Sequence, residues 1–189
     1  MKATDRMLQR WRISKASRFL RPGMRVCDIG CADGSLFHLV AGLKGGVGID
    51  PEAKPRQIGT NSLVAGLFPT ALPDDRKKFD AITLLAVLEH IPTEHQAKLA
   101  FDCFEALAPG GHLLITVPSP AVDHVLKVLS ALRLIHGMNL DQHYGYDIKQ
   151  TPIIFGNAGL ELMRTEKFQL GLNNFFAFRR PLVTYRSST

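Results

Sequence analysis

The chain has 189 residues, a net charge of +6 at neutral pH and 46% hydrophobic residues. This length allows one sizeable core but not two full domains. No apolar run approaches the roughly 20 residues that span a bilayer, and the basic N-terminus lacks the apolar core and cleavage site of a signal peptide, so we expect a cytoplasmic protein. The three cysteines are expected to be reduced structural thiols.

Residues 1–22 predict an amphipathic basic helix that ends at Arg21-Pro22-Gly23. We expect its apolar stripe to pack across the cleft of a ligand site while its basic face stays in solvent. Contact with an anionic partner, such as a membrane lipid, a phosphorylated glycan or RNA, is the alternative. Nucleic acid is disfavoured, because no further stretch interleaves aromatic and basic residues. The cations of this segment are Lys2, Arg6, Arg10, Arg12, Lys15, Arg18 and Arg21.

An apolar strand at Arg25–Ile29 then runs into a turn of small residues that opens a helix, and Gly45-Gly46 ends this helix. A second apolar strand, Val47–Ile49, is followed by Asp50. A small-residue turn lets a ligand approach the backbone, and an acidic residue after the second strand can accept hydrogen bonds from ribose hydroxyls. The sequence therefore predicts a site for an adenosine-containing cofactor. The apolar face of the helix is formed by Leu36, Leu39, Val40 and Leu43.

The turn does not fit the nicotinamide fingerprint Gly-x-Gly-x-x-Gly. Counting from Gly30, Ala32 and Ser35 stand at the second and third glycine positions, and Gly34 lies between them. Asp28 at the strand end adds negative charge where a pyrophosphate would need none, so it suits a cationic ligand better. S-adenosylmethionine carries two such groups, an amino group and a sulfonium.

The rest of the chain alternates strands and helices, as in a parallel α/β protein. A turn or short helix is predicted at Glu52–Arg56, and longer helices at Glu94–Leu107 and Val122–Ile135. The segments Gly159–Leu170 and Asn173–Arg179 are expected to form a closing hairpin. The further predicted strands are Ser62–Ala65, Ala81–Leu85 and His112–Val117.

Three segments resemble, in order and spacing, the motifs of the class I S-adenosylmethionine-dependent methyltransferases. Arg25–Phe37 is similar to the first motif, with Ala32 for its middle glycine. Lys78–Pro92 is similar to the fourth-strand motif, and Ala108–Pro118 to the turn and fifth strand that follow. The resemblance covers most of the chain. It implies one methyltransferase domain, residues 1–189, with a Rossmann-like doubly wound sheet that is mostly parallel, an antiparallel last strand and helices on both faces.

By this resemblance, Asp28 serves the methionine end of the cofactor and Asp50 binds its ribose, with Pro51 at the adenine edge. Many relatives have an acidic residue after the third strand, but Leu67 stands at that position here. Adenine recognition then relies on backbone groups and on contact with Leu67 or Phe68. The expected cofactor-binding residues are Asp28, Gly30, Cys31, Ala32, Gly34, Asp50, Pro51, Leu67, Phe68 and Leu85.

The pair Glu89-His90 raises the alternative of a metal site. Quinone-biosynthesis O-methyltransferases and the small-RNA 2′-O-methyltransferase carry Glu-x-x-Glu-His at this point and bind a divalent metal. Ala86 stands at the first ligand position here, and a site short of one carboxylate binds hard cations poorly, so no metal is expected. His90 and His143 are instead the candidate bases for a hydroxyl acceptor.

Residues 118–151 form the longest segment outside the predicted sheet, and we expect them to cap an acceptor pocket. The family suggests O-methylation of a sugar, lipid, quinone or similar metabolite. Two other functions stay open. The chain could be a non-catalytic cofactor-binding or scaffold protein, because Ala32, Leu67 and Ala86 depart from common patterns. It could also be a nicotinamide-dependent oxidoreductase with the same strand, turn and helix.

Overall fold

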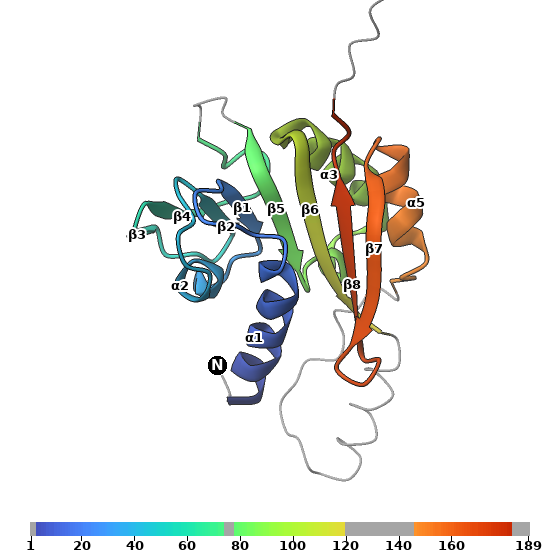
Figure 1. Cartoon of the computed structure of the whole chain (residues 1–189), viewed down its shortest axis with the longest axis horizontal. Coiled ribbons are helices and arrows are strands. Elements are labelled where there is room, and N and C mark those ends of the chain that lie inside the picture. The colour runs from blue at the N-terminus through green and yellow to red at the C-terminus, as the bar shows by residue number, and fades with distance from the viewer. Residues whose placement is uncertain (1–2, 74–77, 120–145, 183–189) are drawn as a thin grey trace, which may run out of the picture.

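The computed structural model describes residues 3–73, 78–119 and 146–182, and the strands in this part of the chain form one eight-stranded sheet (Figure 1). The strands are β1 (Val26–Ile29), β2 (Val47–Asp50), β3 (Arg56–Ile58), β4 (Asn61–Ala65), β5 (Phe79–Leu85), β6 (Leu107–Pro118), β7 (Glu161–Phe168) and β8 (Asn173–Arg179). Their order in the sheet is β3-β4-β2-β1-β5-β6-β8-β7. The neighbours from β4 to β6 run parallel, whereas β3 pairs antiparallel with β4, and β8 pairs antiparallel with β6 and β7.

The direction in which the strands are added reverses beside β1. From β1 the chain steps outward to β2 and β4, and it then places β5 and β6 on the other side of β1. Such a switch point opens a crevice at the carboxyl ends of the central strands, where open α/β sheets bind their ligands. The predicted doubly wound, mostly parallel sheet with an antiparallel last strand is confirmed.

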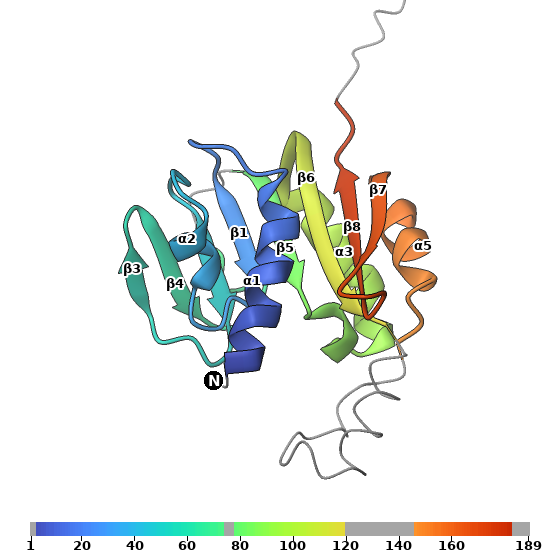
Figure 2. The same cartoon turned by 60° about the horizontal axis from the view of Figure 1, so that its bottom comes forward.

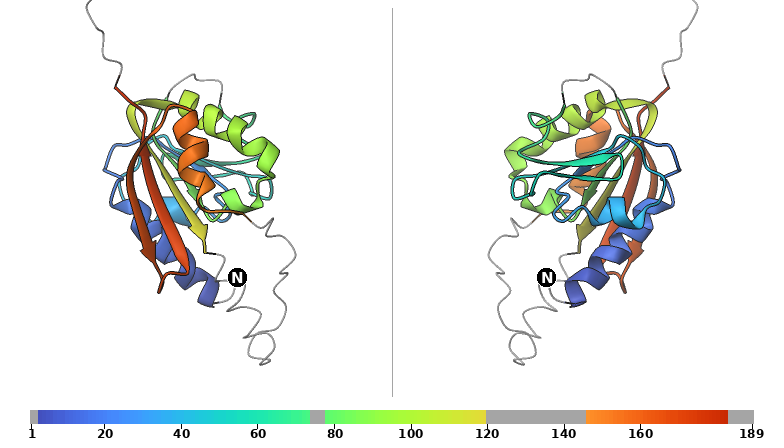
Figure 3. Two further views of the ribbon diagram at one scale, coloured as in Figure 1. Left: turned by 90° about the vertical axis from the view of Figure 1, so that its right-hand side faces the viewer. Right: turned by 90° about the vertical axis from the view of Figure 1, so that its left-hand side faces the viewer.

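Helices cover both faces of this sheet (Figures 2 and 3). They are α1 (Ala3–Ser17), α2 (Ser35–Leu39), α3 (Thr93–Ala106) and α5 (Gln150–Asn157), with a one-turn 3-10 helix η1 (Leu88–His90) after β5. The face under α1 and α2 buries Leu114 and Phe175, and the face under α3 and α5 buries Leu113 and Phe176. None of the described helices is long and apolar enough to cross a bilayer.

The helix after β1 is shorter than its apolar pattern predicts. It ends at Leu39, which is 46% exposed, and Val40 already has extended backbone angles. Gly42 then adopts a φ of +80° and its carbonyl accepts a hydrogen bond from Gly23. Leu43 is still buried, because this turn carries it back to the core. The apolar spacing thus correctly predicts the burial of Leu36 and Leu43 but not the exposure of Leu39 or the length of the helix.

Two further elements differ from the sequence prediction. The last residue of the turn predicted at Glu52–Arg56 begins a strand instead. Arg56 starts β3, a short edge strand that pairs with β4. Helix α5 was not predicted. Its Pro152 stands in the first turn, where a proline lacks only a hydrogen bond that the helix does not need. The helix predicted at Val122–Ile135 lies outside the described residues.

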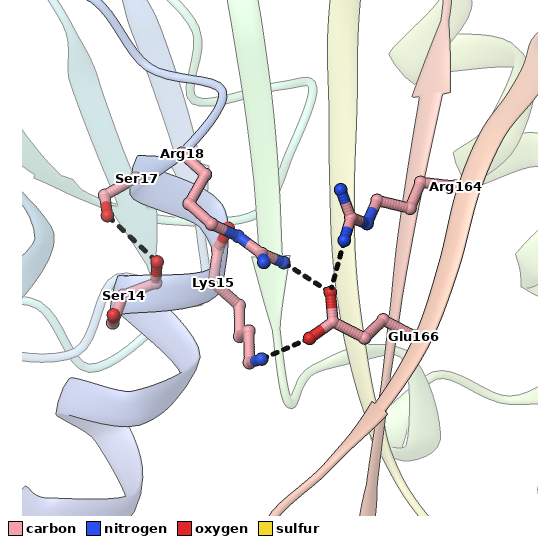
Figure 4. Close-up of polar contacts among 6 residues, drawn as sticks. All are labelled: Ser14, Lys15, Ser17, Arg18, Arg164 and Glu166. Atoms are coloured by element: carbon pink, nitrogen blue, oxygen red, sulfur yellow. Dashed lines mark hydrogen bonds and ion pairs between the residues drawn. The ribbon is translucent and has the colours of Figure 1, made fainter.

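Helix α1 is attached to β7 by an ion-pair cluster (Figure 4). The Glu166 carboxylate of β7 accepts hydrogen bonds from Lys15 and from Arg18 of α1, and Arg164 lies 3.3 Å from it. The hydrogen bonds from Lys15 and Arg18 lower the pKa of Glu166 to about 2. Since Ile13 and Ala16 bury the opposite side of the helix, α1 is held to the sheet by both apolar and ionic contacts.

Replacing Glu166 by glutamine is expected to destabilise the fold by about 1 kcal/mol at neutral pH, because a partly exposed cluster is screened by water. A carboxylate with a lowered folded-state pKa stabilises above its unfolded value and loses this contribution as the pH falls through its folded value. The difference between wild type and Glu166→Gln should therefore shrink between about pH 4.5 and pH 2. Urea unfolding across this range measures it. Glu161→Gln, which breaks an exposed pair with Arg179 near the other end of β7, is the control and should change little.

Candidate active site

The turn after β1 brings the backbone close to the segment that follows β5. Gly30 has a φ of +73°, and a Cβ atom at this position would lie 2.3 Å from Cγ2 of Val87. Only glycine fits there without displacing its neighbour. Ala32 also adopts a left-handed backbone, with a φ of +45°. The position where the resembled motif has its middle glycine thus keeps a conformation that glycine favours, although an alanine occupies it.

Asp50, at the end of β2, has a structural role that the sequence did not indicate. One oxygen of its carboxylate accepts a hydrogen bond from Ala32 N at 3.0 Å, and the other accepts one from Glu52 N at 2.8 Å. The carboxylate therefore holds the turn after β1 against the end of β2. Because each carboxylate oxygen can accept two hydrogen bonds, the side chain still has acceptor capacity for a pair of ribose hydroxyls.

A cavity of about 340 Å³ lies at the carboxyl ends of β1, β2, β4 and β5. Its walls are mostly apolar, and this suits the flat base of an adenosine. Of the residues predicted to bind the cofactor or to act in catalysis, the ones that line it are Gly30, Asp50, Pro51, Leu67, Phe68 and His90. The other lining residues are Ile29, Ile49, Gly66, Ala86, Val87, Ile91 and Leu99.

A second cavity of about 320 Å³ lies beside the first and shares Asp50 with it. Ala32 and Asp33 line it on the side of the turn. The Asp33 carboxylate accepts hydrogen bonds from the backbone N–H and the hydroxyl of Ser35, at 3.1 and 2.7 Å, and so fixes the turn that leads into α2. Arg56 of β3 donates to the Asp33 carbonyl at 2.6 Å. The turn is therefore braced from α2 and from β3.

Four predicted cofactor residues lie outside the lining of both cavities. Gly34 adopts a φ of +72° at the start of α2, and Leu85 packs in the core under α1. Cys31 is buried beside Gly48, and burial raises the pKa of its thiol to about 12, so it fills space rather than reacts. Asp28 is 5% exposed and accepts a hydrogen bond from Thr83 Oγ1 at 2.6 Å. Burial raises the pKa of Asp28 to about 7, although the bond from Thr83 lowers it.

A second titratable group, Glu89, precedes His90 in the helix η1. Glu89 is 3% exposed, and its Oε2 has no hydrogen-bond partner among the described residues. Burial raises the pKa of Glu89 to about 7, and the positive charge of Arg12 opposes this shift. From the sequence, Glu89-His90 was a candidate catalytic pair or metal site, with a structural role at a helix start as the other interpretation of Glu89. The structure adds that Glu89 lies on the one-turn helix η1 after β5 and that its carboxyl is buried. His143 lies outside the described residues.

Metal ligands do not gather in the described part of the chain, where no three His, Cys, Asp or Glu side chains are placed to hold one ion.

Tyr146 lies in the segment before α5, and its hydroxyl is 2.7 Å from Thr151 Oγ1. Burial raises the pKa of Tyr146 to about 12, so its hydroxyl stays protonated at neutral pH.

Comparisons with known proteins agree with this geometry. A family model described as a methyltransferase domain matches residues 4–164. The fold is similar to magnesium protoporphyrin IX methyltransferase from Synechocystis PCC 6803 (TM-score 0.67, 20% identity, 93% of this chain and 84% of that chain). It is also similar to the N-methyltransferase NodS from Bradyrhizobium japonicum WM9 (TM-score 0.63, 17% identity, 94% and 98%). No curated protein matches the sequence.

The match to the family model covers most of the chain, and the similar structures share its sheet. The same segments that resemble the family motifs form β1 with its turn, β5 with η1, and β6. The chain therefore belongs to the class I S-adenosylmethionine-dependent methyltransferases.

Proposed function

We propose that this protein transfers the methyl group of S-adenosylmethionine to a hydroxyl of a small molecule, such as a sugar, lipid, quinone or similar metabolite. The observation that carries the proposal is the apolar cavity bounded by Gly30 and Asp50 at the switch point of the sheet. The magnesium protoporphyrin methyltransferase of similar fold was crystallised with S-adenosylhomocysteine bound, which supports this choice of cofactor.

The residues around the cavity fit the three parts of such a cofactor. The Asp50 carboxylate would accept from the ribose hydroxyls, and Leu67 and Phe68 would contact the adenine. The backbone from Gly30 to Gly34 would lie along the methionine portion, with Asp28 beneath it. When bound, the sulfonium supplies a methyl group that is already electrophilic. The contribution of the chain is therefore mainly to align the acceptor with the carbon–sulfur bond and to exclude water.

A hydroxyl acceptor also needs a base with a pKa near neutrality. His90 lines the cavity, and the buried carboxyl of Glu89 follows β5 at the same edge with a pKa of about 7. Both are candidates for this role. His143 and the acceptor cap formed by residues 118–151 stay predictions.

Calorimetry on the purified full chain tests the cofactor. We expect S-adenosylhomocysteine to bind in the micromolar range, on the order of 7–8 kcal/mol, and NADH not to bind. Binding of NADH without binding of S-adenosylhomocysteine would favour the oxidoreductase alternative. Incubation with S-adenosylmethionine and hydroxyl-bearing acceptors should release S-adenosylhomocysteine. Tight binding of the cofactor with no turnover on any acceptor would favour the scaffold alternative.

Binding of S-adenosylhomocysteine is expected to release protons at pH 7. Because Asp28 has a pKa of about 7, it is half protonated there, and the cationic amino group of the ligand should favour its ionised form. We therefore expect release of up to about half a proton. Titration calorimetry in buffers of different ionisation enthalpy measures this number.

Two variants separate Asp28 from other sources of protons. Asp28→Asn should abolish the release, because an amide does not titrate. Thr83→Val removes the hydrogen bond that lowers the pKa of Asp28, and it should therefore increase the release at pH 7. Equal proton release in wild type and Asp28→Asn would show that Asp28 does not sense the ligand.

A further inference from the structure

The outward face of α1 carries a groove that combines cations with exposed apolar side chains. The groove has a volume of about 590 Å³ and is lined by Arg6, Met7, Arg10, Trp11 and Ser14. Met7 and Trp11 are each 49% exposed. Their positions lie one helical turn apart, as do those of Arg6 and Arg10, so that both pairs form continuous rows. We call this surface the basic-aromatic groove.

The turn between β7 and β8 lies beside α1, the helix that carries this groove. Leu170 at this turn is fully exposed, and its φ of +56° is a left-handed conformation that leucine rarely adopts. Gln169 Nε2 donates to the Leu8 carbonyl at 3.5 Å, which places the turn beside α1. A leucine that is strained and buries nothing contributes nothing to folding. Its position therefore suits contact with something outside the chain.

The flank of α1 next to the groove has an excess of positive charge (Figure 4). Lys15, Arg18 and Arg164 converge on the single carboxylate of Glu166. This cluster keeps a net charge of about +2, because three cations share one anion. Arg6 and Arg10 in the groove add to the same field.

We propose that the basic-aromatic groove and Leu170 dock on a lipid bilayer that carries anionic headgroups. The arginines would meet the phosphates, while Met7, Trp11 and Leu170 would enter the boundary between headgroups and acyl chains. A soluble polyanion would use the cations but leave the three apolar side chains in water. The bilayer is therefore the occupant that matches both features.

This inference goes beyond the proposed function, since it concerns where the protein works. The amino-terminal end of α1 and the β7–β8 turn lie at the end of the molecule where β5 and β6 finish (Figure 1). Because the cavity proposed for the cofactor also lies at these carboxyl ends, docking turns this end of the molecule toward the bilayer. An amphiphilic acceptor would then reach the site from the membrane.

Trp11 is the only tryptophan of the chain, so its fluorescence reports directly on the groove. The full chain is titrated with vesicles of phosphatidylcholine, either alone or mixed with phosphatidylglycerol. We expect a blue shift of the emission and co-sedimentation only with the anionic vesicles. The double variant Arg6→Gln/Arg10→Gln should bind about 30-fold more weakly, since each surface cation contributes about 1 kcal/mol, or about fivefold, near an anionic membrane.

Two further variants complete the test. Lys44→Gln/Lys98→Gln removes the same charge from exposed positions outside the groove and should bind like wild type. Leu170→Asn keeps a residue that tolerates a positive φ, so it should fold normally and bind about tenfold more weakly. Equal losses in the two double variants would overturn the proposal, because they would show a response to net charge alone.

Three other outcomes would also overturn it. The first is the absence of any shift that depends on phosphatidylglycerol. The second is an equal blue shift with heparin, which would assign the groove to a soluble polyanion. The third is a blue-shifted Trp11 in buffer together with a dimer in sedimentation equilibrium, which would assign it to a second copy of the chain. S-adenosylhomocysteine binding is measured on the same preparations, so failure of docking and failure of the proposed function are distinguished.

Discussion

Replacing Gly30 by alanine is expected to destabilise the protein by about 2–5 kcal/mol and to weaken S-adenosylhomocysteine binding more than tenfold. The left-handed backbone at this position costs a residue with a Cβ atom about 1–2 kcal/mol. The new methyl group would also lie 2.3 Å from Val87 Cγ2, and overpacking of this kind costs about 1–3 kcal/mol. Urea unfolding measures the first effect and titration calorimetry the second.

Gly23→Ala is the matched control for Gly30→Ala. Gly23 also has a positive φ, of +89°, but no atom lies within 4 Å of the place that a methyl group would take there, so only the backbone cost of about 1–2 kcal/mol is expected. Truncating the neighbour in the double variant Gly30→Ala/Val87→Ala should recover about 1–3 kcal/mol as coupling energy. Equal effects at Gly23 and Gly30, without coupling to Val87, would contradict the tight contact between the turn and the segment after β5.

Replacing Asp50 by alanine is expected to cost about 2–3 kcal/mol of S-adenosylhomocysteine affinity, or about 30- to 150-fold, through loss of charge-assisted hydrogen bonds to the ribose. The fold should also lose about 1 kcal/mol, because the N–H groups of Ala32 and Glu52 lose their acceptor. Calorimetry and urea unfolding measure the two losses separately.

Asp80→Ala separates these two roles of Asp50. The Asp80 carboxylate also accepts a hydrogen bond from a backbone N–H, that of Arg25 at 2.8 Å, but it lies at the start of β5, away from the cavity. We expect a similar loss of stability and unchanged ligand affinity. If Asp50→Ala bound S-adenosylhomocysteine as tightly as wild type, the ribose would have to be bound elsewhere.

The sequence was sufficient to predict the family and most of the sheet. Apolar runs such as Val47–Ile49 and the small-residue turn after Arg25–Ile29 are local signals, because a buried parallel strand needs consecutive apolar residues and a tight turn needs glycine. Once the strands are located, the sequence also shows that Asp50 and Leu67 stand just after the ends of two of them. Where a local signal was weak, as for the edge strand β3 or for α5 with its Pro152, the sequence prediction was incomplete.

Only the tertiary structure decided what the individual polar groups do. Asp50 holds the turn of Ala32 across 18 positions of the chain, and Thr83 meets Asp28 across 55. The near-neutral pKa of Glu89 arises from burial, which depends on every element packed around it. The exposure of Trp11 likewise depends on which face of α1 meets the sheet. Spacing along the chain determined the strands and their turns, whereas charge, exposure and hydrogen bonding were set by residues brought together from distant segments.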